Sequence, residues 1–130
     1  MFKTDDYWIT IAEVKGFSTA AAAVFSADER EALTDFLAMS PASGELVEGS
    51  GGLRVVSWPA KSQGPAGEVE VLYLFRDLNM PVHLLGIYES DDPFDPSEEE
   101  LVLMASRVEE LVDAYAAQKL AVFKSPSGAA

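Results

Sequence analysis

Three short runs rich in β-branched and aromatic residues lie in the middle of the chain, separated by turn-forming segments. They cover residues 53–58, 68–75 and 82–88. The second run begins in strict alternation of polar and apolar residues, which is the period of a half-buried strand. Strands that follow one another through short loops pair as hairpins. The sequence therefore predicts an antiparallel meander of three strands.

A strand and a short helix are predicted at the start of the chain. Residues 7–14 are rich in aromatic and β-branched residues and predict a strand that Gly16 terminates. A short helix is expected through residues 20–25, with Ser18 or Thr19 as its N-cap.

A second helix is expected to begin at Ser26 and to stop before Pro41. Two carboxylates, Asp28 and Glu29, lie in its first turn, where they favour helix formation. Apolar residues then recur at spacings of three and four, which places them on one buried face. These predicted core residues are Leu33, Phe36 and Leu37.

The last part of the chain predicts an acidic linker followed by one amphipathic helix. The linker covers residues 89–100, and Ser97 with Glu100 has the spacing of a capping box. The helix is expected to run to about Lys119, and residues 125–130 are expected to form a flexible tail. Its apolar stripe comprises Leu101, Met104, Val108, Leu111, Val112 and Tyr115.

Together these elements predict the α+β class, in the order β, α, α, β, β, β, α. A length of 130 residues suffices for one core. We expect a single domain over residues 1–124, in which a small antiparallel sheet is packed by helices on one face.

The charge balance restricts the partners. Nine Lys and Arg against 22 Asp and Glu give a net charge of −13. A field of that sign repels phosphate backbones and anionic membranes, so direct binding of nucleic acid or lipid is disfavoured. A basic protein partner is allowed.

The composition also favours a cytoplasmic location. The chain has no cysteine, which fits a reducing compartment. Its apolar stretches are too short to cross a bilayer, and the charged residues Lys3, Asp5 and Asp6 leave no room for a signal peptide.

Metal and nucleotide sites are not expected, and neither is a cofactor. Asp91, Asp92 and Asp95 lack the spacing of an EF-hand, so a solvated acidic loop is the expected role. The glycine-rich residues 49–52 are not followed by the Lys-Ser or Lys-Thr pair of a phosphate loop.

Residues 40–54, SPASGELVEGSGGLR, are similar to a signature of HigB-like toxins in the RelE superfamily, roughly nPe-G-dlI-GtGGlRK-R. The resemblance covers about residues 26–112. It continues at Trp58, Gly64, Gly67, Tyr73, residues 84–88 and residues 95–97.

The resemblance implies a RelE-like fold and an ancestry among messenger-RNA endonucleases, many of which act on the ribosome. Their chemistry requires Lys and Arg, which hold the phosphate and stabilise developing negative charge. Arg54 matches one of these cations. The chain departs from the pattern elsewhere: Val55 and Ser57 replace Lys and Arg, Pro65 replaces a loop Lys, Glu70 replaces a strand Arg, and Glu89 and Ser90 stand where Lys is frequent.

The leading hypothesis is therefore a non-catalytic RelE/HigB-like protein that binds another protein, either an antitoxin-like partner or a basic nucleic-acid-binding protein. One alternative is a divergent ribosome-dependent mRNA endonuclease of a toxin–antitoxin system. The other is an acidic mimic of nucleic acid that inhibits a basic partner, such as a phage-encoded anti-defence protein. An exposed edge strand also leaves room for a homodimer.

No catalytic residue is expected under the leading hypothesis. If catalysis persisted, the residues to carry it would be Arg54, Lys61, His83 and Tyr73. Trp58 is an anchor for a partner if it faces outward, and a core residue otherwise. The predicted partner-binding residues are Arg54, Trp58, Glu68, Glu70, Asp91 and Asp92.

Overall fold

The computed structural model describes residues 11–64 and 67–129, and within them the protein is α+β, with a five-stranded mixed sheet and three α-helices. Residues 7–10 of the first predicted strand lie outside the described residues. Two compact units are present, Met1–Glu48 with Gly52–Asp95 and Gly49–Gly51 with Pro96–Ala130. The single domain over residues 1–124 stays a prediction.

The predicted meander is confirmed. Strands β3 (Leu53–Pro59), β4 (Glu68–Leu74) and β5 (Val82–Tyr88) pair antiparallel in sequence order. A bulge interrupts β5, because Leu72 pairs with Gly86 while Tyr73 pairs with Leu84. The extra residue lets Leu84 and Ile87, three positions apart, contact the same core.

The sheet is not purely antiparallel, and this expectation was wrong. Strand β1 (Ile11–Glu13) lies parallel to β5, since two helices carry the chain across the sheet before the meander begins. A short strand β2 (Glu45–Leu46) pairs with β3 at the opposite edge. Two residues are too few for a sequence pattern to predict. The strand order is β1-β5-β4-β3-β2.

Helix α1 (Lys15–Val24) begins earlier than predicted. Its N-cap is Val14, whose N–H bonds to the Leu84 carbonyl, so pairing with β5 sets the turn into the helix. Ser18, an expected cap, instead donates to Glu13. Thr19 and Gly16 also lie inside the helix.

Helix α2 (Ala27–Met39) begins as predicted, with a complete capping box. The Glu29 N–H donates to Ser26 Oγ, and the Ser26 N–H donates to Glu29 Oε1.

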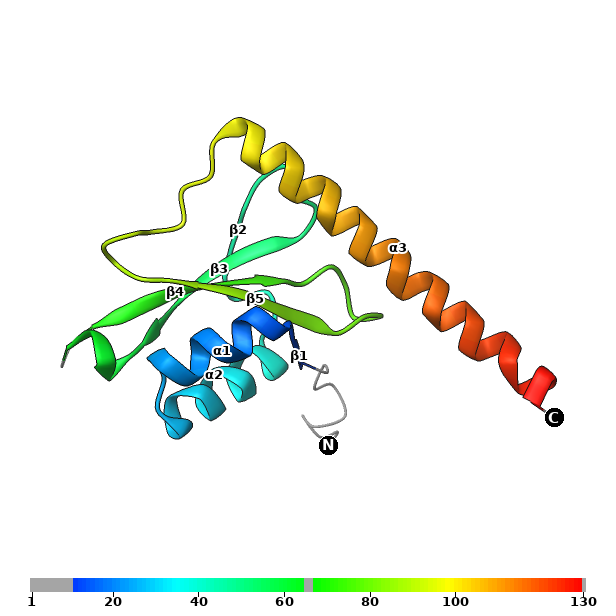
Figure 1. Ribbon diagram of the computed structural model, residues 1–130, viewed down its shortest axis with the longest axis horizontal. Helices are drawn as coiled ribbons and strands as arrows, with labels where there is room; N and C mark the ends of the chain where they lie inside the picture. Colours follow the sequence, from blue (N-terminus) through cyan, green and yellow to red (C-terminus); the bar gives the residue numbers. More distant parts are fainter. Residues whose placement is uncertain (1–10, 65–66, 130) are drawn as a thin grey trace. The chain divides into compact units, whose positions relative to one another are not determined.

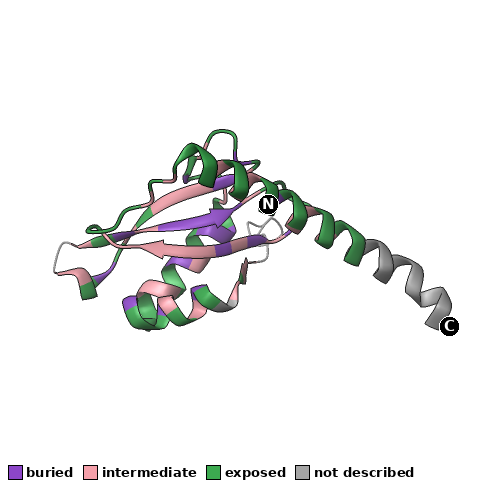
Figure 2. Ribbon diagram, turned by 45° about the horizontal axis from the view of Figure 1, so that its top comes forward, coloured by how far each residue is buried: buried purple, intermediate pink, exposed green. Residues whose placement is uncertain are grey.

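Helices α1 and α2 lie together on one face of the sheet (Figure 1). Figure 2 shows buried segments in the central strands and in these two helices. Phe36, predicted to be core, is 37% exposed, although its ring packs against Trp58 of β3. The buried core includes Phe17, Ala21, Leu33, Leu37, Val69, Val71, Tyr73, Val82 and Leu84.

The second unit contains helix α3 (Glu98–Ala129), which begins with the predicted Ser97–Glu100 capping box. The helix continues past Lys119 to Ala129, so its predicted end was wrong, and the flexible tail over residues 125–130 stays a prediction. No helix in the described part of the chain is long and apolar enough to cross a membrane.

Candidate functional site

One end of the sheet carries a row of polar residues on the face opposite α1 and α2. Ser57, Glu70 and Tyr88 lie side by side, since Ser57 pairs with Glu70 and Glu70 pairs with Tyr88. Directly opposed residues point to the same face, and neighbours along a strand point to opposite faces. Because Val69 and Val71 contact the helices, Glu70 faces away from them.

A hollow of about 200 Å³ opens at this end of the sheet. Three carboxylates line it, and none of its described lining residues is Lys or Arg. The lining residues are Ser57, Glu68, Val69, Glu70, Tyr88, Glu89, Ser90 and Pro93. We call this feature the acidic hollow. It suits a cation or a hydrogen-bond donor and repels a phosphate.

The segment after β5 forms one wall of the acidic hollow. The Phe94 N–H donates to Glu70 Oε1 at 3.1 Å. The Phe94 ring packs edge-on against Tyr88, with ring centroids 5.2 Å apart. Residues 89–92 form a turn, in which the Asp92 N–H donates to the Glu89 carbonyl at 2.9 Å. Glu70 therefore fixes the acidic segment against the sheet.

Burial of Tyr88, followed by the nearby charge of Asp92, raises the pKa of the Tyr88 phenol. The phenol stays protonated at neutral pH and can donate a hydrogen bond. Asp91 and Asp92 are exposed beside the acidic hollow. The predicted residues Glu68, Glu70, Asp91 and Asp92 are thus brought to one end of the sheet.

Arg54 lies elsewhere and has a structural role. It pairs with Tyr73 on the face that carries α1 and α2. Its guanidinium Nη1 donates to the carbonyls of Ala42 and Gly44 at 3.1 and 2.8 Å. The cation therefore holds the loop between α2 and β2.

Tyr73 supports the same loop from the core. Its ring is fully buried, and its hydroxyl donates to the Pro41 carbonyl at 2.7 Å. The same oxygen accepts the Gly44 N–H at 2.8 Å. Burial raises the pKa of the Tyr73 phenol, against the weaker opposing effects of the Gly44 hydrogen bond and the Arg54 charge.

Trp58 packs against α2 and does not face outward. Its indole N–H donates to the Glu29 carbonyl at 3.0 Å. Its ring lies 5.2 Å from that of Phe36, measured between centroids. Trp58 was expected to anchor a partner only if it faced outward. It lies instead on the face of β3 that carries α1 and α2, as Arg54 does.

Of the four residues proposed for residual catalysis, Arg54 and Tyr73 meet at the loop of residues 41–44, while His83 and Lys61 make other contacts. His83 Nδ1 lies 3.0 Å from the Pro81 carbonyl, and the Lys61 N–H donates to Glu29 at 2.9 Å. None of the four residues lines the acidic hollow. None of them lines the second hollow, between α1 and α2, either.

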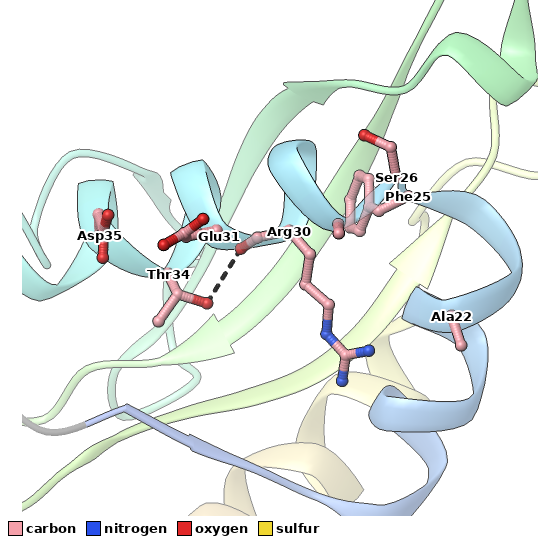
Figure 3. Close-up of a pocket in the computed structure, with 8 residues that line it drawn as sticks. Ala22, Phe25, Ser26, Arg30, Glu31, Thr34 and Asp35 are labelled. Carbon is pink, nitrogen blue, oxygen red and sulfur yellow. Dashed lines mark hydrogen bonds between the residues drawn. The ribbon is translucent and has the colours of Figure 1, made fainter.

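A second hollow, of about 540 Å³, lies between α1 and α2 and is more open (Figure 3). Its one described cation, Arg30, is paired with Glu13 at 2.6 Å. Thr34 donates to the Arg30 carbonyl on the same helix. The remaining lining residues are Ala22, Phe25, Ser26, Ala27, Glu31 and Asp35.

No known protein-family model matches the chain. The likeness to RelE and HigB toxins therefore stays a resemblance. Among the described residues, no three His, Asp or Glu side chains are placed to hold a metal ion.

Sequence reasoning missed the part of the site that depends on the path of the chain. Tyr88 and Glu89 stand out in the sequence, as an aromatic strand residue and as an acidic replacement of a frequent Lys, but their place beside Glu70 follows only from strand pairing. Phe94 was missed because nothing in an acidic segment indicates that it folds back. An aromatic residue among carboxylates was its only signal.

Proposed function

We propose that the protein is a non-catalytic RelE/HigB-like protein that acts by binding another protein at the acidic hollow. The observation that carries the proposal is that Glu68, Glu70 and Glu89 line the hollow, with no cation among its described lining residues. In the resemblance, Glu70 stands in place of an RNA-contacting Arg. A carboxylate at this position repels an RNA phosphate by a few kcal/mol, because two unit charges 4 Å apart near a protein surface interact by about 4 kcal/mol.

The retained residues do not restore RNA cleavage under this proposal. The Arg54 cation and the Tyr73 hydroxyl are bonded to the loop of residues 41–44. Removing one electrostatic interaction with a transition state costs about 3 kcal/mol, so the absence of several cations together abolishes most of the catalysis.

The partner fitted by this chemistry presents Lys or Arg to the acidic hollow. Its cation would sit among three carboxylates, with the Tyr88 phenol as a donor nearby. The net charge of −13 also speeds the approach of a basic protein. An antitoxin-like protein and a basic nucleic-acid-binding protein both satisfy this description.

Catalysis is tested by adding the purified protein to a cell-free translation reaction and mapping message ends by primer extension. Intact message and normal translation are expected. Discrete cuts at codons within the ribosome that disappear in an Arg54→Ala variant would overturn the proposal in favour of a divergent ribonuclease.

Binding is tested with a fluorescent oligolysine peptide at increasing salt concentrations. The double variant Glu68→Gln, Glu89→Gln is expected to bind the peptide at least about tenfold more weakly than wild type. Glu99→Gln, Glu110→Gln, on α3, carries the same charge change and serves as the matched control. Equal losses in the two double variants would show that net charge alone attracts the peptide.

The second candidate function is an acidic mimic of nucleic acid. It is favoured by Glu68, Asp91 and Asp92, which are exposed at the same end of the sheet. A mimic predicts affinity for a basic nucleic-acid-binding protein that falls steeply with salt, as phosphate contacts do. A binding module whose partner also packs on apolar surface tolerates salt better.

A further inference from the structure

The outer edge of β3 is only half covered. Strand β2 pairs with Arg54 and Val55, and no described strand pairs with the outer side of β3 from Val56 to Pro59. Unpaired strand edges present backbone donors and acceptors to other chains.

The backbone of Ser57 faces this open edge. The Val47 N–H donates to the Leu53 carbonyl, so the backbone of Leu53 points toward the β2 side. Alternate residues of a strand direct their N–H and C=O groups to the same side, and Val55 and Ser57 therefore point the same way as Leu53. Ser57 lies beyond the end of β2.

Exposed apolar side chains flank the edge on the side of α2. Leu46 pairs with Arg54 and so lies on the helix-bearing face, where it is 48% exposed. Phe36 contacts Trp58 of β3, and Met39 follows one turn later on the same side of α2. Met39 is 51% exposed. We call Phe36, Met39 and Leu46 the edge patch.

Acidic residues lie on and around the edge. Glu45 belongs to β2 and Glu48 follows it, and both are exposed. Glu45 pairs with Val55 and so faces away from the helices, on the side of the acidic hollow. A strand added to this edge would place alternate side chains on the edge patch and the others toward Glu45 and the acidic hollow.

We propose that this edge docks an extended segment of a partner protein in which apolar residues alternate with Lys or Arg. Backbone hydrogen bonds to Ser57 hold the segment, and the edge patch covers its apolar side. The inference rests on the proposed function, because both require a protein partner, and it adds the Ser57 backbone and the edge patch to the acidic hollow. A second copy of the chain carries the same net charge of −13 and is repelled, so a basic partner fits this edge better.

The probe is a fluorescent peptide of about eight alternating Val and Lys residues, with binding measured by anisotropy at physiological salt. Two variants test the edge. Leu46→Lys disrupts the edge patch, and Ser57→Pro removes the edge N–H without changing charge. Leu78→Lys is the matched control, because Leu78 is 71% exposed in the turn before β5. Circular dichroism confirms that each variant is folded.

We expect Leu46→Lys and Ser57→Pro to weaken peptide binding at least about tenfold, and Leu78→Lys to leave it close to wild type. A peptide N-methylated at alternate residues should not bind. Equal losses in Leu46→Lys and Leu78→Lys, tight binding of the methylated peptide, or self-association through Leu46 would overturn the proposal. Oligolysine binding to Leu46→Lys, which leaves the lining of the acidic hollow unchanged, reports separately on the hollow, so the two proposals can fail independently.

Discussion

The Glu70 carboxylate accepts the backbone N–H of Phe94, 24 positions later in the chain, at 3.1 Å. One residue of a central strand thereby fixes the segment that forms a wall of the acidic hollow. In the resemblance this position is an Arg, which could not accept this hydrogen bond. The carboxylate therefore has a structural task in addition to its charge.

Replacing Glu70 with Ala should release the wall. We expect faster hydrogen exchange at the Phe94 amide and a loss of about 1–2 kcal/mol in the free energy of unfolding, because a charged acceptor is removed. Amide exchange followed by NMR and urea unfolding measure the two effects. Glu70→Gln keeps an acceptor oxygen, so its exchange rate and its stability should lie between those of wild type and the Ala variant. Unchanged exchange at Phe94 in the Ala variant would show that other contacts hold the segment.

The Tyr73 hydroxyl should contribute more to stability than that of Tyr88. Tyr73→Phe leaves the Gly44 N–H and the Pro41 carbonyl without their partner, at a cost of about 2–3 kcal/mol. Tyr88→Phe is the matched control, because its hydroxyl makes no hydrogen bond in the described structure. Chemical denaturation of both variants gives the comparison. Similar small losses would contradict a role for Tyr73 in holding the loop.

Gly44→Ala should destabilise the protein by about 2–3 kcal/mol. A Cβ at this buried position would lie 2.7 Å from the Tyr73 hydroxyl oxygen and 2.9 Å from the Val55 carbonyl oxygen. Gly16→Ala, inside α1 with open space around its Cβ, should instead stabilise by about 0.5–1 kcal/mol. Thermal unfolding of both variants shows whether the signs are opposite, and unchanged stability in Gly44→Ala would mean that the loop can move.

The ion pair of Glu13 with Arg30 should make stability depend on pH. The Arg30 hydrogen bond holds the pKa of the Glu13 carboxyl below its ordinary value. Because the folded-state pKa is lowered, the pair stabilises above the ordinary glutamate pKa of about 4.3, and this is lost as pH falls through the folded value.

Arg30→Gln should therefore cost about 0.5–1 kcal/mol at pH 7, since the pair is partly exposed, and much less at pH 3. Urea unfolding at both pH values measures the difference. Arg107→Gln, on α3, changes the charge equally and should show no such pH dependence. A pH-independent loss in the Arg30 variant would assign its effect to packing.

Local signals in the sequence predicted local structure well. The Ser26–Glu29 and Ser97–Glu100 capping boxes depend on neighbouring residues, and both helices begin where expected. The alternation from Glu68 likewise predicted β4. Pairing of Ile11 with Val82 depends on how helices cross a sheet, which no local pattern contains.

The site was predictable only in its charges. The carboxylates at Glu68, Glu70 and Asp92 can be read directly; strand pairing places Glu70 beside Tyr88, and the turn after β5 brings Asp92 near it. The direction of Trp58 could not be read, because its strand has apolar residues on both faces. The task of Arg54 depends on the carbonyls of a loop that sequence alone does not position.

The parallel pairing of β1 with β5 has a consequence during synthesis of the protein. β1, α1 and α2 emerge from the ribosome before β4 and β5 do, so Phe17 and Leu33 at first have no complete sheet to cover them. Non-local pairing of this kind slows folding and leaves apolar surface open to aggregation in the meantime. The nascent chain must keep its first two helices apart from other chains until Val82 has emerged.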